Sequence, residues 1–328
     1  MNYEDFLKEL LDCLHDMNPD AVIDLQRVVS ANDTKRDALL IRMNADAHIS
    51  PAIYIEEYYR YFTDPDREPV TIAQVAHAIM QQYFTCSVNT DFADQIANLF
   101  QDIANVKNHI IFRLVGIENN QNILKTVPHR RIYDMALIYY LTFYVDSKGQ
   151  LLMGTPDAEA ISSDQYMNAS AMITMQHLNI WNMTENDLYM QAMVNTPKLL
   201  PFEMRDIRSM LREFSVSAGI DNLDEEQFSQ SMWILTNTRR LYGASCCMYP
   251  GLLERLADRM QTDFYCLPSS VHEMILLPTD LNDPDRMQVR ETLYSMVCEV
   301  NATAVKDEDK LTDNVYYYNY KTRSFCAL

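Results

Sequence analysis

The order of hydrophobic patterns in the last third of the chain restricts the fold more than any other feature. Alternating apolar residues predict strands over 231–237, 264–267, 272–277 and 314–320. Helical spacing predicts helices over 252–260 and from Asp283-Pro284 onward. The resulting order, β-α-β-β-α-β, is typical of an antiparallel or mixed sheet with helices packed on one side. We therefore expect a fold of the α+β class.

The chain is long enough for about two domains. Residues 107–195 can be interpreted as a looser version of the same strand and helix order, which predicts two related α+β layers. The polar stretch Ser215 to Gln230 interrupts the hydrophobic pattern. We place the boundary there, with an N-terminal α+β unit over 1–220 and a C-terminal unit over 221–328 packed closely on it.

The first two thirds of the chain show further local signals. Helical spacing predicts a helix over 2–17, and two β-rich segments, 21–29 and 38–43, predict a hairpin. Ser50-Pro51 resembles an N-cap followed by proline, which predicts a helix through about Phe62 that carries Tyr54, Tyr58 and Tyr61.

Three more helices and one long strand are expected from the same kind of pattern. A helix should begin at Thr71, a capping box at Thr184 and Asp187 should open another, and residues 201–214 should form a third. The apolar run from Asp134 to Val145 predicts a long strand.

Charge and glycine content exclude several classes of function. The chain has 27 Lys and Arg against 46 Asp and Glu, a net charge of −19, which is unfavourable for contacts with nucleic acid phosphates. The pairs Arg130-Arg131 and Arg239-Arg240 leave direct nucleic acid binding as a minor hypothesis. Only 6 residues are glycine, too few for many phosphate-cradling loops.

The sequence also predicts a cytoplasmic location. The N-terminal residues are acidic where a signal peptide requires basic ones. The most apolar run, 135–145, is shorter than the ~20 residues that span a bilayer. The seven cysteines are an odd number and are expected to be reduced thiols.

Known catalytic and metal-binding motifs match the sequence poorly. Gly149 and Gly154 have the spacing of a phosphate loop, but no lysine follows them. Asp280, Asn282 and Glu291 fit three positions of a calcium loop, but proline and aspartate occupy positions that the loop needs for other residues. No zinc-ligand spacing occurs. We therefore expect no metal and no cofactor.

A serine nucleophile of the elbow type is also disfavoured. Ser245 follows a predicted strand, but Cys247 replaces the second glycine of the motif. A turn that allows the next helix to pack closely is the favoured interpretation.

One group of chemically active side chains remains, in the predicted turn between two strands. Ser269, Ser270, His272 and Glu273 lie within five residues, a density that acid–base or nucleophilic chemistry uses. Strand alternation places Ser270 and His272 on one face and Glu273 on the other, so the four cannot all converge. A structural role, with hydroxyls bonding turn amides, is favoured.

Phrases spread over nearly the whole chain resemble a family of uncharacterised proteins. They include Ser50-Pro51-Ala52-Ile53-Tyr54, Leu235-Thr236-Asn237, Tyr242-Gly243-Ala244, Leu267 to Glu273, and Asn314-Val315-Tyr316-Tyr317-Tyr318. The family is a domain-of-unknown-function family of gut Clostridia, often encoded near mobile-element genes. The resemblance implies a bacterial or phage-associated origin and carries no activity or catalytic residues.

Two functional hypotheses follow. The first is a non-enzymatic interaction or regulatory protein that binds another protein, because the chain has 20 Met and 20 Tyr, side chains that suit partner surfaces, and because its acidity could attract a basic partner. The alternative is a hydrolase or transferase that uses the turn from Ser269 to Glu273, with Tyr242 or Arg239 nearby.

Overall fold

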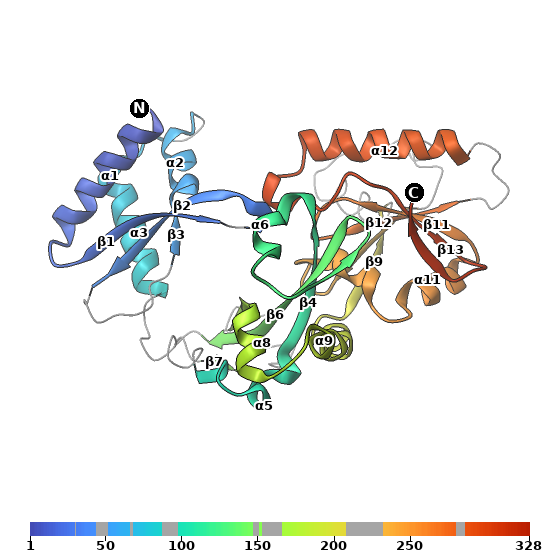
Figure 1. Ribbon diagram of the computed structural model, residues 1–328. Coiled ribbons are helices and arrows are strands. Elements are labelled where there is room, and N and C mark those ends of the chain that lie inside the picture. The colour runs from blue at the N-terminus through green and yellow to red at the C-terminus, as the bar shows by residue number, and fades with distance from the viewer. Residues whose placement is uncertain are drawn as a thin grey trace. The chain divides into compact units, whose positions relative to one another are not determined.

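The computed structural model describes residues 1–29, 31–43, 52–65, 68–86, 98–146, 151–152, 166–207, 232–279 and 286–328 (Figure 1). These residues form helices and three antiparallel sheets, so the α+β class is confirmed. The chain divides into two compact units. Unit 1 contains residues 1–30, 34–102 and 143–169, and unit 2 contains residues 31–33, 103–142 and 170–328. The predicted boundary between 220 and 221 lies outside the described residues and stays a prediction.

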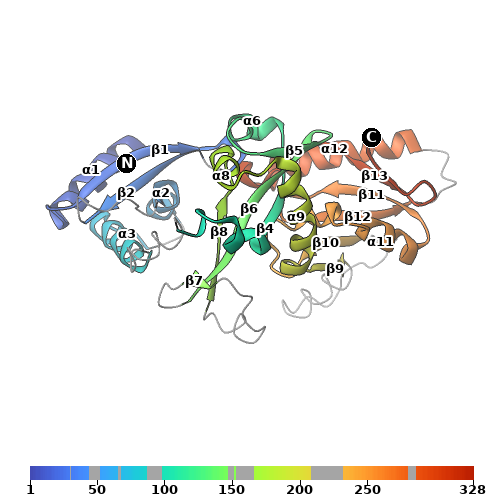
Figure 2. The same cartoon turned by 60° about the horizontal axis from the view of Figure 1, so that its bottom comes forward.

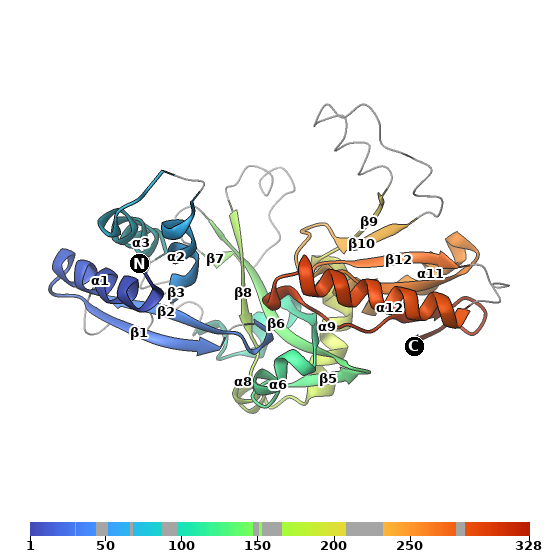
Figure 3. The same cartoon turned by 90° about the horizontal axis from the view of Figure 1, so that it is seen from above.

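Unit 1 packs helices on a small sheet. Strands β1 (Val22–Val29), β2 (Lys35–Arg42) and β3 (Ala52–Tyr54) form the sheet, and the predicted hairpin of β1 and β2 is confirmed. Its helices include α1 (Tyr3–Met17), α2 (Ile55–Thr63) and α3 (Ile72–Cys86), and α3 contacts the other two (Figure 3).

The core of unit 1 comes from the helix spacing that the sequence shows. Phe6, Leu10 and Leu14 recur on one face of α1 and are fully buried, together with Ile41 of the sheet and Ile79 of α3. Asn2 caps α1, because its side chain accepts a hydrogen bond from the amide of Asp5.

The predicted helix start at Ser50-Pro51 is wrong in part. Pro51 and Ser50 lie outside the described residues, but Ala52–Tyr54 form β3, and the helix begins only at Ile55. Ile53 pairs with Leu39 of β2, so sheet hydrogen bonds hold this segment extended.

Unit 2 is built around a six-stranded antiparallel sheet in the order β14-β13-β11-β12-β10-β9 (Figure 2). Its strands are β9 (Phe202–Asp206), β10 (Trp233–Asn237), β11 (Asp263–Pro268), β12 (Met274–Thr279), β13 (Tyr316–Asn319) and β14 (Ser324–Ala327). With α11 (Leu252–Met260) and α12 (Arg286–Thr303), the predicted order of the last third is confirmed, and β9 and β14 extend the sheet at its two edges.

Helical segments lie at both faces of this sheet rather than at one. Leu293 and Val297 of α12 pack against Tyr265 and Tyr317 on one face. Helix α11 lies at the other face (Figure 1) and contacts the buried 3-10 helix η5 (Gly243–Met248).

The predicted helix over 201–214 is wrong where the structure describes it. Phe202–Asp206 form β9, whose residues pair with β10 from Phe202 opposite Asn237 to Asp206 opposite Trp233. Pairing with the open edge of β10 satisfies the backbone of this segment, and this tertiary gain overrides its helical spacing. Residues 208–214 lie outside the described part of the chain.

The third sheet has β6 (Met135–Asp146) at its centre. It pairs with β4 (Ile110–Gly116) and β5 (His129–Ile132), and also with β7 (Leu151–Leu152) and β8 (Tyr166–Met172). Helix α9 (Glu185–Leu199) packs on β4 and begins with the predicted capping box of Thr184 and Asp187. The short helices α5 (Ile103–Val106), α6 (Gln121–Leu124) and α8 (Met175–Trp181) connect the strands, with 3-10 turns η1 (Ala31–Asp33), η2 (Lys107–His109), η3 (Glu118–Asn120) and η6 (Asp307–Asp309).

Candidate functional site

The five residues from Ser269 to Glu273 form the turn between β11 and β12. The strand predicted over 272–277 begins only at Met274, so His272 and Glu273 belong to the turn. The amides of Ser269 and Ser270 donate to the carbonyl of Glu273. The Ser269 hydroxyl donates to Glu273 Oε1 at 3.2 Å, and Ser270 Oγ accepts from the amide of His272 at 3.0 Å. Both hydroxyls therefore bond groups of their own turn.

Both ring nitrogens of His272 bond neighbouring protein groups. Nδ1 accepts from the backbone amide of Tyr242 at 3.1 Å, which requires Nδ1 to be unprotonated. The proton of the neutral ring is then on Nε2, which lies 3.1 Å from Asp309 Oδ1. A general base needs a free nitrogen that faces the nucleophile. In this arrangement the imidazole instead links η5 and η6 to the turn.

Tyr242 lies beside His272, and its ring takes part in a stack with an arginine. The ring centroids of Tyr242 and His272 are 5.4 Å apart. The Arg113 guanidinium lies 3.9 Å from the Tyr242 ring and 4.0 Å from the Tyr140 ring, so it is held between two tyrosines. The structure thus brings Tyr242 to the turn, whereas Arg239 donates to Thr142 Oγ1 at 3.4 Å.

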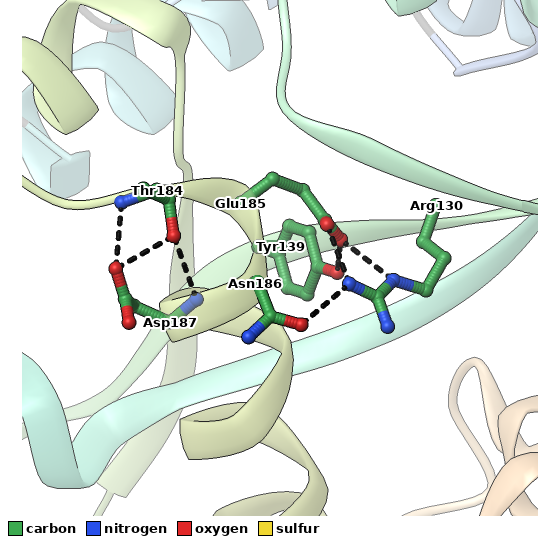
Figure 4. Close-up of polar contacts among 6 residues, drawn as sticks. All are labelled: Arg130, Tyr139, Thr184, Glu185, Asn186 and Asp187. Atoms are coloured by element: carbon green, nitrogen blue, oxygen red, sulfur yellow. Dashed lines mark hydrogen bonds and ion pairs between the residues drawn. The ribbon is translucent and has the colours of Figure 1, made fainter.

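The arginine pairs that the sequence marks as basic patches have specific partners. Arg130 donates through two nitrogens to Glu185, at 3.1 and 2.7 Å (Figure 4). Its guanidinium lies 3.7 Å from the ring of Tyr189. Glu185 also accepts from the hydroxyl of Tyr139. The hydrogen bond between Arg130 and the Glu185 carboxylate is the main cause that raises the pKa of Arg130. Arg130 therefore joins β5 to the first turn of α9.

The other arginines of these pairs are similarly placed. Arg131 donates to the carbonyl of Tyr133 at 2.8 Å, and Arg240 lies 3.4 Å from the carboxylate of Glu203. The bond to a carboxylate reduces the positive charge that Arg240 could present to a phosphate backbone, as it does for Arg130.

Ser245 and the neighbouring cysteines are buried structural groups. Ser245 is 2% exposed, and its hydroxyl oxygen accepts from the amide of Leu114 at 2.9 Å. Burial raises the pKa of the Cys246 thiol to about 12 and raises that of Cys247 as well. Thiols with raised pKa values hold little reactive thiolate at neutral pH.

Replacing Ser245 with alanine is expected to destabilise the protein by about 1–3 kcal/mol, because the buried amide of Leu114 loses its acceptor. Urea denaturation followed by fluorescence measures this loss. The matched control is Ser269→Ala, which removes a partly exposed hydroxyl and should change stability by less than about 1 kcal/mol. Equal losses for both variants would contradict the assigned role of Ser245.

The described residues contain no group of three or more His, Cys, Asp or Glu side chains that could hold a metal ion. Asp280 and Asn282, like Gly149 and Gly154, lie outside the part of the chain that the structure describes, while Glu291 lies in α12. Among the described helices, none combines the length and the apolar character needed to cross a bilayer.

A groove in unit 1 is the second candidate site. It lies between α2 and α3, has a volume of about 440 Å³, and is lined by Tyr58, Tyr61, Val70, Val75, Ala78 and their polar neighbours. The structure thus brings two of the three tyrosines on the predicted helix to one groove. Tyr54 instead lies under the Arg36 guanidinium, 4.9 Å away.

Net charge is distributed unequally between the two units. Unit 1 has 8 Lys and Arg and 21 Asp and Glu in its 126 residues, a net charge of 8 − 21 = −13. Unit 2 has 19 Lys and Arg and 25 Asp and Glu in its 202 residues, a net charge of 19 − 25 = −6. Most of the net negative charge therefore belongs to the smaller unit.

Comparison with known protein families shows a match over nearly the whole chain. The model of a family described as a family of unknown function, DUF5688, matches residues 3–154 and 159–320. No curated protein and no solved structure matches the chain.

Proposed function

The chain belongs to DUF5688, a family of unknown function, and we propose that it is a non-enzymatic interaction protein whose acidic unit 1 binds a basic protein. The observation that carries this proposal is the net charge of −13 on unit 1, against −6 on the larger unit 2. A concentrated charge attracts partners of opposite sign and increases the rate of encounter. Unit 2, which is larger, has a much smaller excess of acidic residues.

The contacts at the turn from Ser269 to Glu273 support this choice over the alternative of a hydrolase or transferase. A hydrolytic dyad needs a hydroxyl that faces a free imidazole nitrogen. Here the hydroxyls bond turn groups, and His272 bonds Tyr242 and Asp309. The carboxylate partners of Arg130 and Arg240 likewise favour a protein partner over nucleic acid.

A cytoplasmic location is part of the same proposal, since reduced thiols and a basic intracellular partner fit together. An origin in gut Clostridia near mobile-element genes, which the sequence resemblance implies, stays a prediction.

The proposal is tested with a fluorescein-labelled peptide of alternating Lys and Ser, measured by anisotropy with the full-length protein at low and high salt. Double reversal of two exposed acids on α1, Glu9→Lys with Asp12→Lys, is expected to weaken binding about tenfold, since exposed charges contribute ~0.2–1 kcal/mol each. Binding should also weaken as salt rises.

The matched control reverses two exposed acids of unit 2, Glu118→Lys with Glu299→Lys, which changes the total charge by the same amount. We expect this control to weaken binding less than about threefold, because these charges belong to the unit that is not proposed to bind the peptide and exposed charges are screened by salt. Equal effects of the two double variants, or no binding of the peptide at low salt, would refute the proposed function.

A further inference from the structure

The groove between α2 and α3 combines an apolar floor with a bridge between its two helices. Val75 is buried, while Tyr61 is 47% exposed. The hydroxyl of Tyr58 donates to the side chain of Gln82, which joins α2 to α3 within the groove lining. A volume of about 440 Å³ accommodates several apolar side chains of a partner.

Helix α3 lacks charge in a strongly acidic unit. Its 15 residues, Ile72–Cys86, include no Asp, Glu, Lys or Arg. Its exposed positions are occupied by Ala73, Gln74, His77, Ala78 and their neighbours Gln81 and Gln82. A solvated helix face normally carries charged residues, and depletion of charge is the composition of an interface core.

Acidic residues are exposed on the two helices that contact α3. Helix α1, which contacts α3, exposes Glu4, Asp5, Glu9, Asp12 and Asp16 against one lysine, Lys8. On α2, the other helix of the groove, the side chain of Glu57 is 67% exposed at the groove lining, and Arg60 is the one basic residue of that helix. An uncharged centre with an acidic margin is complementary to an apolar stripe flanked by Lys and Arg.

We propose that the α2–α3 groove binds an amphipathic helical segment of the basic partner, with its apolar side chains against Tyr61 and Ala78 and its basic side chains toward the acidic margin. This inference rests on the proposed function and adds the docking site and the form of the ligand. Helix-in-groove binding of this kind places anchors at helical spacing along the partner.

The test compares two labelled peptides of about 18 residues, five helical turns, with the same number of lysines. One peptide is amphipathic, made of Lys and Leu, and the other replaces every Leu with Ser. Full-length protein is expected to bind the Leu peptide about tenfold more tightly, because only that peptide buries apolar side chains.

Ala78→Lys places a long basic side chain in the groove, whereas Ala73→Lys makes the same change at an exposed position of the same helix outside the groove lining. We expect the first variant to weaken binding of the Leu peptide about tenfold, and the second less than about threefold. Tyr61→Ala should also weaken that binding, and circular dichroism checks that all three variants fold. Neither lysine variant should change binding of the Ser peptide more than about threefold.

Three outcomes would overturn the groove assignment. Equal effects of Ala78→Lys and Ala73→Lys, or equal affinity for the two peptides, would show that charge alone determines binding. Such a result leaves the proposed function intact if the α1 reversals still weaken binding of the Lys–Ser peptide. A dimer in sedimentation that Ala78→Lys disrupts would identify a second copy of this chain as the occupant.

Discussion

Replacing Gly243 with alanine is expected to destabilise the protein by about 3 kcal/mol or more, because the new methyl group has no space. A Cβ at this position would lie 2.1 Å from Thr236 Oγ1, 2.6 Å from the carbonyl oxygen of His272 and 2.7 Å from the amide nitrogen of Asn237. Two of these atoms belong to the backbone. Removing these steric clashes therefore requires displacement of β10 or of the turn after β11. Such a displacement also disturbs the hydrogen bond from the Thr236 hydroxyl to the His272 carbonyl.

Urea denaturation and thermal unfolding measure this effect, and we expect the midpoint temperature to fall by roughly 10 °C for a unit of this size. The control is Gly251→Ala. Gly251 has a φ of +66°, and no atom lies within 4 Å of the position that its Cβ would take, so only backbone strain of about 1 kcal/mol is expected. If the two variants lost equal stability, close packing at Gly243 would not be the cause.

The second large effect is expected from Asn120→Ala, which removes the centre of a buried amide network in unit 2. Asn120 Oδ1 accepts from the amide of Asn32 at 3.0 Å, and its Nδ2 donates to Asn32 Oδ1 at 2.7 Å and to the Gly116 carbonyl at 2.8 Å. The variant leaves one buried donor and two buried acceptors without these partners. With each such group costing ~1–3 kcal/mol, we expect a total loss of about 3 kcal/mol or more.

The control for this prediction is Asn122→Ala, two residues along the chain. The Asn122 side chain is exposed, and its Oδ1 accepts a hydrogen bond from the Lys125 ammonium at 3.2 Å. Its removal should cost no more than about 0.5 kcal/mol. Comparable unfolding midpoints in urea for the two variants would show that the buried network of Asn120 does not contribute to stability as we infer.

Close packing at Gly243 explains why the candidate catalytic turn is better understood as part of the scaffold. Gly243 permits close approach of η5 to the turn, and the imidazole of His272 bonds the amide next to it. Ser269 and Ser270 satisfy amides and carboxylates nearby. A local density of reactive side chains can therefore arise from the hydrogen-bonding needs of a tight turn.

The location of the candidate groove depended on contacts that no local pattern contains. Helical spacing indicated that Tyr58 and Tyr61 share one side of a helix. That Val75 and Ala78 of α3 lie opposite them follows only from the packing of the two helices against each other. The unequal charge of the two units likewise depends on the tertiary structure, since unit 1 includes residues 143–169 from later in the chain.

The sequence by itself determined the elements whose signals are local. Apolar periodicity placed α1, α11 and the strands β10 to β13, and a side-chain cap placed the start of α9, because these features depend on neighbours within a few residues. Tertiary structure decided β3 and β9, where pairing with β2 and β10 holds the backbone extended against its apparent helical spacing. It also decided the role of His272, since Asp309 lies 37 positions away and only folding brings the two side chains together.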